Sequence, residues 1–356
     1  MEFIDAAVEL PWLGMPVWIW LSFVGVVVGL LAFDLGVLHG KPHEVTVRES
    51  AILSAFFICM GWVFSVIVAY IYYQADPATL SDPQLAALSD PLTRAWHAAQ
   101  LFITGLLVEQ SLSIDNIFVI SLVFSYFAVP RRYQHRVLFW GILGVIIMRG
   151  LMIAGGAVLL ERFHWVLYVF GAFLLFTGLK MLLVVGEEPD IANNVILKFL
   201  KKRMRVTDQL HDEHFFVMAP DKKTGKLVRH ATPLFLALAV IEFIDLVFAV
   251  DSVPAVFAIT QEPFIVYTSN IFAILGLRSL YFALAAMVHR FHYLKYALAL
   301  VLVFIGAKIF LSGWIGKFPS ELSLGITLAL LAGGVLFSLW KTKADAGHTS
   351  VDSAGH

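Results

Sequence analysis

Charged residues are scarce in this sequence of 356 residues: Asp, Glu, Lys and Arg together make up 14%, whereas hydrophobic residues make up 60%. A soluble domain has roughly a quarter charged residues, so this chain has too few charges to cover a water-facing surface. The shortage argues against a soluble enzyme, a disordered protein and a nucleic-acid-binding protein. The single cysteine, Cys59, excludes an intrachain disulfide. The composition therefore predicts an integral membrane protein.

Nine apolar runs are each long enough to cross ~30 Å of hydrocarbon as a helix. They are continuously apolar and lack the alternation of a membrane barrel, which favours helices. The expected fold is all-α: a polytopic membrane protein with a single transmembrane domain over residues 1–343 and a disordered tail over 344–356. The expected spans cover residues 17–38, 50–73, 97–127, 137–160, 163–185, 232–258, 264–288, 294–313 and 320–340.

Lys and Arg concentrate in every second loop between these runs. The loop of residues 186–231 alone holds nine of them, and the loops after the first, third, seventh and ninth runs are also basic. The other side holds only Arg94, Arg162 and Lys317. Because short cytoplasmic loops are enriched in Lys and Arg, we expect the N-terminus outside and the C-terminus in the cytoplasm.

The cytoplasmic loop of residues 186–231 has two local features. The stretch from Ile196 to Met204 has the pattern of a short amphipathic helix. Further on, His211 and His214 flank two acids, a grouping compatible with a metal sensor. Because spacing fixes no third ligand, a plain solvated loop is the preferred interpretation.

The fifth and eighth runs repeat one another. RFHWVLYVFGAFLLFTGLK ends at Lys180, RFHYLKYALALVLVFIGAK ends at Lys308, and Gly178 and Gly306 also match at this offset of 128 residues. Similar matches relate the third and fourth runs to the sixth and seventh, so residues 97–185 form one repeat and residues 232–313 form a second. Units of three helices must enter the membrane from opposite sides, so the repeat is inverted. That architecture is typical of secondary transporters, with the site near the midplane.

Ionisable residues fall inside the expected spans, where each costs ~2.5–3.5 kcal/mol on insertion scales and marks function by default. Six acids against four bases leave about two negative charges, which a divalent cation would neutralise. The candidate ligands are hard oxygens, which favour Mg²⁺, Ca²⁺ or Mn²⁺. The alternative is that acids and bases pair as structural ion pairs, a role we expect for the four bases. The acids are Asp34, Glu109, Asp115, Glu242, Asp245 and Asp251, the bases are Arg149, Arg278, Lys180 and Lys308, and the neutral oxygen ligands are Ser113, Asn116, Ser252 and Asn270.

Helix geometry sorts these candidates. At ~100° per residue, Glu109 shares a face with Asn116, and Asp245 shares one with Ser252. Asp115 lies ~120° around the helix from Glu109. These two acids can meet at one ion only if the helix breaks or a neighbouring span closes the site. Asp34 and Glu242 are the weakest candidates. Asp34 lies near the cytoplasmic end of its span, where an acid can face the membrane interface.

Two acidic motifs, EQSLSIDNIFVI (109–120) and EFIDLVFAVDS (242–252), resemble the paired signatures of the TerC family, in particular its Alx-like branch. The resemblance extends from the segment AFDLGVLHGKPHEVTVRES to the ninth span. It implies a bacterial inner-membrane protein related to the LysE-type cation exporters and associated with manganese export and tellurite resistance. It also implies that the Mn²⁺ route is formed by Glu109, Asp115, Asn116, Asp245 and Asp251, with Glu242 as a weaker member.

The sequence predicts a secondary transporter that exports a divalent cation, most simply Mn²⁺, in exchange for protons. A dehydrated carboxylate holds either a proton or a metal ion, and binding of one expels the other. Moving a divalent cation outward against 100 mV costs ~4.6 kcal/mol. The sequence contains no P-loop that would bind ATP, so protons are the expected coupling ion. No prosthetic group is expected.

Three other function classes compete with this one. HExxH, GxGD and GxSG motifs are absent, so we expect no enzyme. A cation channel would use the same acids but would not depend on protons. An assembly protein, linked to metal or tellurite resistance, would dock a membrane partner, a role for which the charged loop of residues 186–231 is suited. A homo-oligomer is the other partner arrangement considered.

Overall fold

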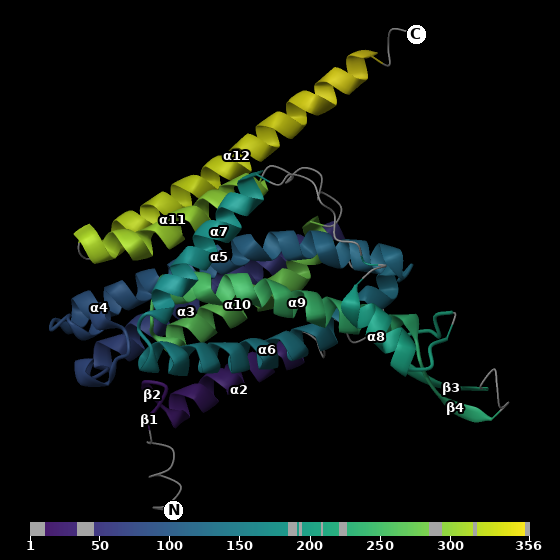
Figure 1. The fold of residues 1–356 in the computed structure, drawn as a ribbon, viewed down its shortest axis with the longest axis horizontal. Coiled ribbons are helices and arrows are strands. Elements are labelled where there is room, and N and C mark those ends of the chain that lie inside the picture. The colour runs from purple at the N-terminus through teal and green to yellow at the C-terminus, as the bar shows by residue number, and fades with distance from the viewer. Residues whose placement is uncertain are drawn as a thin grey trace, which may run out of the picture.

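The computed structural model describes residues 11–33, 46–183, 191, 194–207, 209–220, 226–284, 294–315 and 319–352. Within these residues a helix lies on each of the nine apolar runs (Figure 1). The expectation of a mostly helical membrane fold is therefore confirmed. The long helices are α2 (Val17–Phe33), α3 (Val47–Gln74), α5 (Pro91–Tyr126), α6 (Arg131–Arg162), α7 (Val166–Leu183), α9 (Pro233–Phe257), α10 (Pro263–Leu284), α11 (Leu294–Ile315) and α12 (Ser320–Asp352).

Six helices in the described residues are long and apolar enough to cross a membrane, and two shorter apolar stretches, Val17–Phe33 and Pro263–Leu277, accompany them. The outward faces of these helices are apolar as well. Val66 of α3 is 68% exposed, and Leu151 of α6 is 70% exposed. Large apolar side chains displayed on several helices suit a surface covered by lipid rather than water. The chain is thus a multi-pass membrane protein, and nine crossings stay a prediction.

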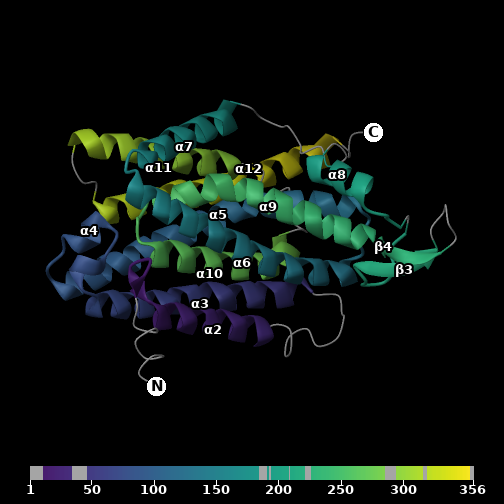
Figure 2. The ribbon, with the colours of Figure 1, turned by 60° about the horizontal axis from the view of Figure 1, so that its bottom comes forward.

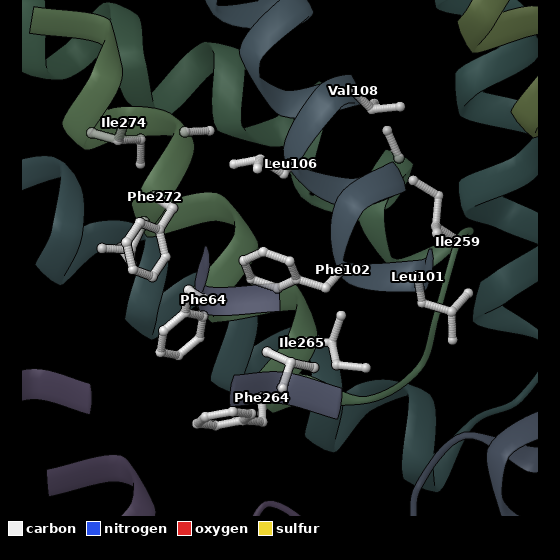
Figure 3. Close-up of a cluster of buried hydrophobic side chains, with 14 of the residues drawn as sticks. Phe64, Leu101, Phe102, Leu106, Val108, Ile259, Phe264, Ile265, Phe272 and Ile274 are labelled. Atoms are coloured by element: carbon white, nitrogen blue, oxygen red, sulfur yellow. The ribbon is translucent and has the colours of Figure 1, made fainter. Parts of the chain in front are cut away.

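Helix α5 runs through the interior of the bundle and packs against α3, α9 and α10 (Figure 2). Aromatic rings fix its contact with α3 and α10. The ring of Phe64 lies 5.6 Å from that of Phe102 and 4.7 Å from that of Phe272, centre to centre. Figure 3 shows these three side chains gathered in one apolar cluster. Such ring contacts add to the burial of apolar area, and they set which face of α5 is turned towards α10.

Helices α7 and α11 approach one another closely through glycines. A Cβ atom at Gly178 would lie 2.8 Å from the carbonyl oxygen of Ala299, and one at Gly306 would lie 2.8 Å from that of Gly171. Real Cβ atoms do not come so close to a carbonyl oxygen. Both positions therefore require glycine, and the two contacts are reciprocal: each glycine meets the residue seven positions before the other glycine.

Different small elements occupy the two ends of the bundle (Figures 1 and 2). One end carries α8 (Val195–Arg203) and a hairpin of β3 (Phe216–Pro220) and β4 (Leu227–Ala231). The expected amphipathic helix is therefore present as α8, and Asn194 caps it by accepting from the backbone N–H of Ile196 at 2.9 Å. The other end carries η2 (Pro77–Thr79), α4 (Pro83–Ala86) and the short strands β1 (Pro11–Trp12) and β2 (Met15–Pro16).

Two acids of the His211–His214 segment are held against α6. The hydroxyl of Tyr133 donates to Asp212 Oδ1 at 3.2 Å, and Arg136 forms an ion pair with Glu213 at 3.1 Å. No group of three or more His, Cys, Asp or Glu in the described residues is placed to hold a metal ion. His211, Asp212 and His214 are exposed, so the segment is a solvated loop that two polar contacts hold beside α6.

The C-terminal segment differs from its prediction. Residues 344–352 continue α12 as helix instead of forming a disordered tail, and residues 353–356 lie outside the described part. No proline follows the apolar part of this helix before residue 352, so every residue there can donate its backbone N–H to the helix.

Candidate functional site

A charged network lies at the centre of the bundle, between α5, α6, α9 and α10. Arg149 of α6 is 2% exposed and Glu109 of α5 is fully buried. The guanidinium Nη1 of Arg149 donates to Glu109 Oε1 and to Asn270 Oδ1. Ser252 Oγ of α9 lies 3.2 Å from the same nitrogen, and Asn270 Nδ2 donates to Glu109 Oε2 at 3.3 Å. Four helices thus meet at one buried ion pair. Each charge of the pair offsets the desolvation cost that the other would have if it were buried alone.

The predicted shared faces of α5 and α9 meet at this network. Asn116, two turns along α5 from Glu109, donates from Nδ2 to Asp245 Oδ1 at 3.5 Å. Asp245 lies two turns before Ser252 on α9, and both are buried. The spacing of seven residues therefore brings two residues of each helix into one polar layer.

A cavity of about 30 Å³ adjoins the network and is lined by both Arg149 and Asp245. Apolar side chains from α5, α6, α9 and α10 form most of the rest of its wall, and Tyr281 lines it as well. A volume of this size is enough for at least one water molecule. Within the described residues the Nε atom of Arg149 is buried and has no hydrogen-bond acceptor. The central network therefore borders a small cavity that both Arg149 and Asp245 reach.

Asp251 is not part of this network, although it lies on the same helix. Its Oδ1 accepts a hydrogen bond from Thr177 Oγ1 of α7 at 3.5 Å, and Lys180 is near enough to interact with it electrostatically. Asp251 lies six residues beyond Asp245, so it points to a different side of α9. The structure thus separates the two α9 acids into a central position and a position against α7.

Glu242 packs against a glycine face of α6 and is partly buried. A Cβ atom at Gly144 would overlap its carboxylate, and one at Gly141 would lie 3.7 Å from Oε1. The absence of side chains at these two positions makes the room that Glu242 occupies. Glu242 therefore lies beside the central network, at the contact of α6 with α9.

The remaining predicted residues lie elsewhere or outside the described part. Lys308 of α11 donates to Ser323 Oγ of α12 at 3.3 Å, so it joins these two helices and not the centre. Ser113 is buried, has no partner for Oγ within the described residues, and lines a separate cavity of about 210 Å³ between α3, α5 and α10. Helix α5 continues unbroken past Asp115. The side chains of Asp115 and Arg278 and the whole of Asp34 lie outside the described residues.

Residues 94–346 match the integral membrane protein TerC family. This chain belongs to the TerC family. It is 44% identical over 320 residues to an "Uncharacterized membrane protein" of Rickettsia felis, which covers 90% of this chain and 97% of that protein. It is 42% identical over 324 residues to the "Putative membrane-bound redox modulator Alx" of Escherichia coli K12, covering 90% and 94% of the two chains. No solved structure matches this TerC-family chain.

A second buried acidic site of this TerC-family protein lies at the end of the bundle that carries α4. The carboxylate of Glu262, just before α10, is fully buried. Its Oε1 accepts from the backbone N–H groups of Ser81 at 2.5 Å and Asp82 at 2.9 Å, and its Oε2 accepts from the Tyr72 hydroxyl at 3.1 Å. Burial, together with the negative charge of Asp82, raises the pKa of Glu262 to about 7, although the three hydrogen bonds act to lower it.

Sequence reasoning did not select Glu262 or Asp82, although a local signal was present. Each precedes a proline that begins a helix, Pro263 of α10 and Pro83 of α4. An acid or polar residue followed by Pro is a helix-start pattern. The pattern identifies capping residues one at a time, but not their contact across 180 residues.

Proposed function

We propose that this TerC-family protein is a secondary transporter of the bacterial inner membrane that exports a divalent cation, with Mn²⁺ favoured, in exchange for protons. The observation that carries the proposal is the central network, in which Glu109, Arg149 and Asn270 are buried together. Ionisable residues buried where several membrane helices meet are expensive and mark a functional site by default. Carboxylate, amide and hydroxyl oxygens are ligands that Mn²⁺ accepts.

The arrangement of the helices supports an inverted repeat. Helix α5 packs on α10, and its counterpart α9 packs on α6, which is the counterpart of α10. The reciprocal contacts of Gly178 and Gly306 are those expected when a two-fold axis runs between α7 and α11. The network lies between α5–α6 and α9–α10, the position that such transporters use for their ions.

The exchange follows from the chemistry of the buried acids. A buried carboxylate is ionised beside a metal ion and takes up a proton when that ion leaves, because the charged form without a cation is penalised. We assign this role to Asp245, since Glu109 is paired with Arg149. Protons entering down their gradient then supply the ~4.6 kcal/mol that export of a divalent cation requires at 100 mV. Transport, and not catalysis, is the proposed role of the polar centre.

Flux measured in proteoliposomes tests the proposal. Mn²⁺ movement is followed with a Mn²⁺-quenched dye while a pH gradient is imposed, for the wild type and for Asp245→Asn and Asp115→Asn. We expect gradient-driven flux in the wild type and its loss in both variants. Glu161→Gln is the matched control, because Glu161 is an exposed acid at the end of α6. Flux that is unchanged in both Asn variants, or that is absent from the wild type, would overturn the proposal.

Two other functions give different outcomes in the same experiment. A channel would give flux that neither saturates with Mn²⁺ nor depends on the pH gradient. An assembly protein would give no flux and would co-purify with a membrane partner. The redox role named for the relative in Escherichia coli cannot use an intrachain dithiol in this chain, because the sequence contains one cysteine.

A further inference from the structure

The buried guanidinium of Arg149 is poorly matched to the groups around it. Three oxygens, from Glu109, Asn270 and Ser252, lie within hydrogen-bonding reach of the single atom Nη1. A guanidinium Nη carries two hydrogens, so it cannot give a full hydrogen bond to three acceptors. At the same time Nε of the same side chain has no acceptor within the described residues. In an arginine with a purely structural role, we would expect the acceptors to be shared among its N–H groups, so that each buried donor has a partner.

The same three oxygens form a suitable set of ligands for a metal ion. They are a carboxylate, an amide carbonyl and a hydroxyl, contributed by α5, α10 and α9. Hard divalent cations bind oxygens of these kinds. The second oxygen of Glu109 is held by Asn270 Nδ2, which fixes the orientation of the carboxylate. Nη1 of Arg149 therefore occupies the centre of an oxygen cage defined by Glu109, Asn270 and Ser252.

We infer that Arg149 is a tethered cation that fills this oxygen cage in the ion-free state and must be displaced by the transported ion. The inference rests on the proposed function and assigns to Arg149 the role of competitor. The displaced guanidinium has a destination, because Arg149 and Asp245 line the same small cavity. A second carboxylate is therefore available there to receive the guanidinium.

A tethered competitor has a mechanistic use in an exporter. A buried carboxylate with no resident cation would hold a divalent ion strongly and release it slowly. Arg149 returns to Glu109 when the ion leaves, so it lowers the apparent affinity of the cage and speeds release. The charge of the cage also stays balanced in the empty protein, which allows the empty site to change its accessibility in the low-dielectric core.

Two substitutions at position 149 separate this role from a structural one. Arg149→Gln removes the competing charge, so we expect Mn²⁺ to bind at least tenfold more tightly while transport turnover falls at least tenfold. Arg149→Lys keeps the charge on a nitrogen with three hydrogens, which matches three oxygens, so we expect at least threefold weaker Mn²⁺ binding. A purely structural arginine predicts that both variants lose stability and Mn²⁺ affinity together.

The measurements are calorimetric titration of the detergent-purified full chain with MnCl₂ and Mn²⁺ flux in proteoliposomes, with thermal unfolding as a check of folding. Arg162→Gln is the matched control, since Arg162 is an exposed arginine at the end of the same helix. Tighter binding in Arg149→Gln with slower flux supports the inference, and equal or weaker binding in a folded Arg149→Gln overturns it. If Arg149→Gln does not fold, weaker binding in a folded Arg149→Lys supports the inference and unchanged binding overturns it. If the wild type neither binds nor transports Mn²⁺, the proposed function fails as well. If the wild type is active and Arg149→Gln gains no Mn²⁺ affinity, only the inferred role of Arg149 is wrong.

Discussion

The side chains of Glu262 and Asp82 each accept hydrogen bonds from the loop that contains the other residue. The backbone N–H of Asp82 donates to Glu262 Oε1 at 2.9 Å, while Asp82 Oδ2 accepts from the backbone N–H of Gln261 at 3.0 Å and from Thr260 Oγ1 at 2.7 Å. These bonds join the connection between α3 and α5 to the corner between α9 and α10. Because both carboxylates are buried, the junction contributes to stability and responds to pH.

The stability of the protein should fall between pH 4.5 and about 7. Burial raises the pKa of Glu262 from 4.5 to about 7, so the folded state keeps a proton that the unfolded state releases. This difference in pKa adds ~3 kcal/mol to the free energy of unfolding below pH 4.5, and the added stability is lost as pH rises through about 7. We expect the Tm in detergent to be higher at pH 5 than at pH 8. Glu262→Gln should reduce this dependence, and an unchanged slope in that variant would contradict the assignment.

Removal of the Asp82 carboxylate should destabilise the fold. Asp82→Ala leaves the N–H of Gln261 and the N–H groups at the start of α4 without an acceptor, with an expected loss of ~2–4 kcal/mol. Asp76→Ala is the matched control, because Asp76 also caps a helix, η2, but is exposed. Denaturant or thermal unfolding should show a larger effect for Asp82→Ala. Equal effects would mean that the bonds to Thr260 and Gln261 contribute little.

Alanine at Gly178 or at Gly306 should be destabilising to a similar degree. Each new Cβ would meet a backbone carbonyl oxygen at 2.8 Å, so α7 and α11 must move apart, at an expected cost of ~1–3 kcal/mol. Gly155→Ala is the control, since nothing lies within 4 Å of its Cβ position and alanine favours the helix. Thermal unfolding of the three variants tests this. If one of the two interface variants were as stable as the wild type, the two contacts would not contribute equally to stability, although their geometry is the same.

Glu109→Gln should destabilise the protein more than Arg149→Gln. Loss of the carboxylate leaves a buried guanidinium that cannot lose its proton, whereas loss of the guanidinium leaves a carboxyl that can take one up. Breaking a buried pair costs ~3–5 kcal/mol, and replacing both partners costs much less. The double variant should therefore recover most of the Tm lost in Glu109→Gln. Additive losses in the double variant would contradict a direct pairing of the two residues.

Local sequence determined much of the fold. Apolar runs of sufficient length predicted every long helix, because a membrane span must satisfy its own backbone hydrogen bonds. The helix caps also follow local sequence patterns. Thr46 and Glu49 form a capping box at the start of α3, and the Asp90 carboxylate caps α5 by accepting from the backbone N–H of Thr93. The spacing of seven residues predicts that Glu109 and Asn116 share one face of their helix. These features depend on contacts within a turn or two of helix, so the sequence by itself contains them.

Only the tertiary structure decided which groups meet across helices. Helical periodicity gives the angle between two side chains on one helix, but not the rotation of that helix against its neighbours. The pairing of Arg149 with Glu109, and the position of Asp251 against α7 instead of the centre, follow from that rotation. The rotation is set by aromatic packing and by glycine contacts between segments more than a hundred residues apart. No local pattern records such contacts, because their free energy appears only when the whole bundle has packed.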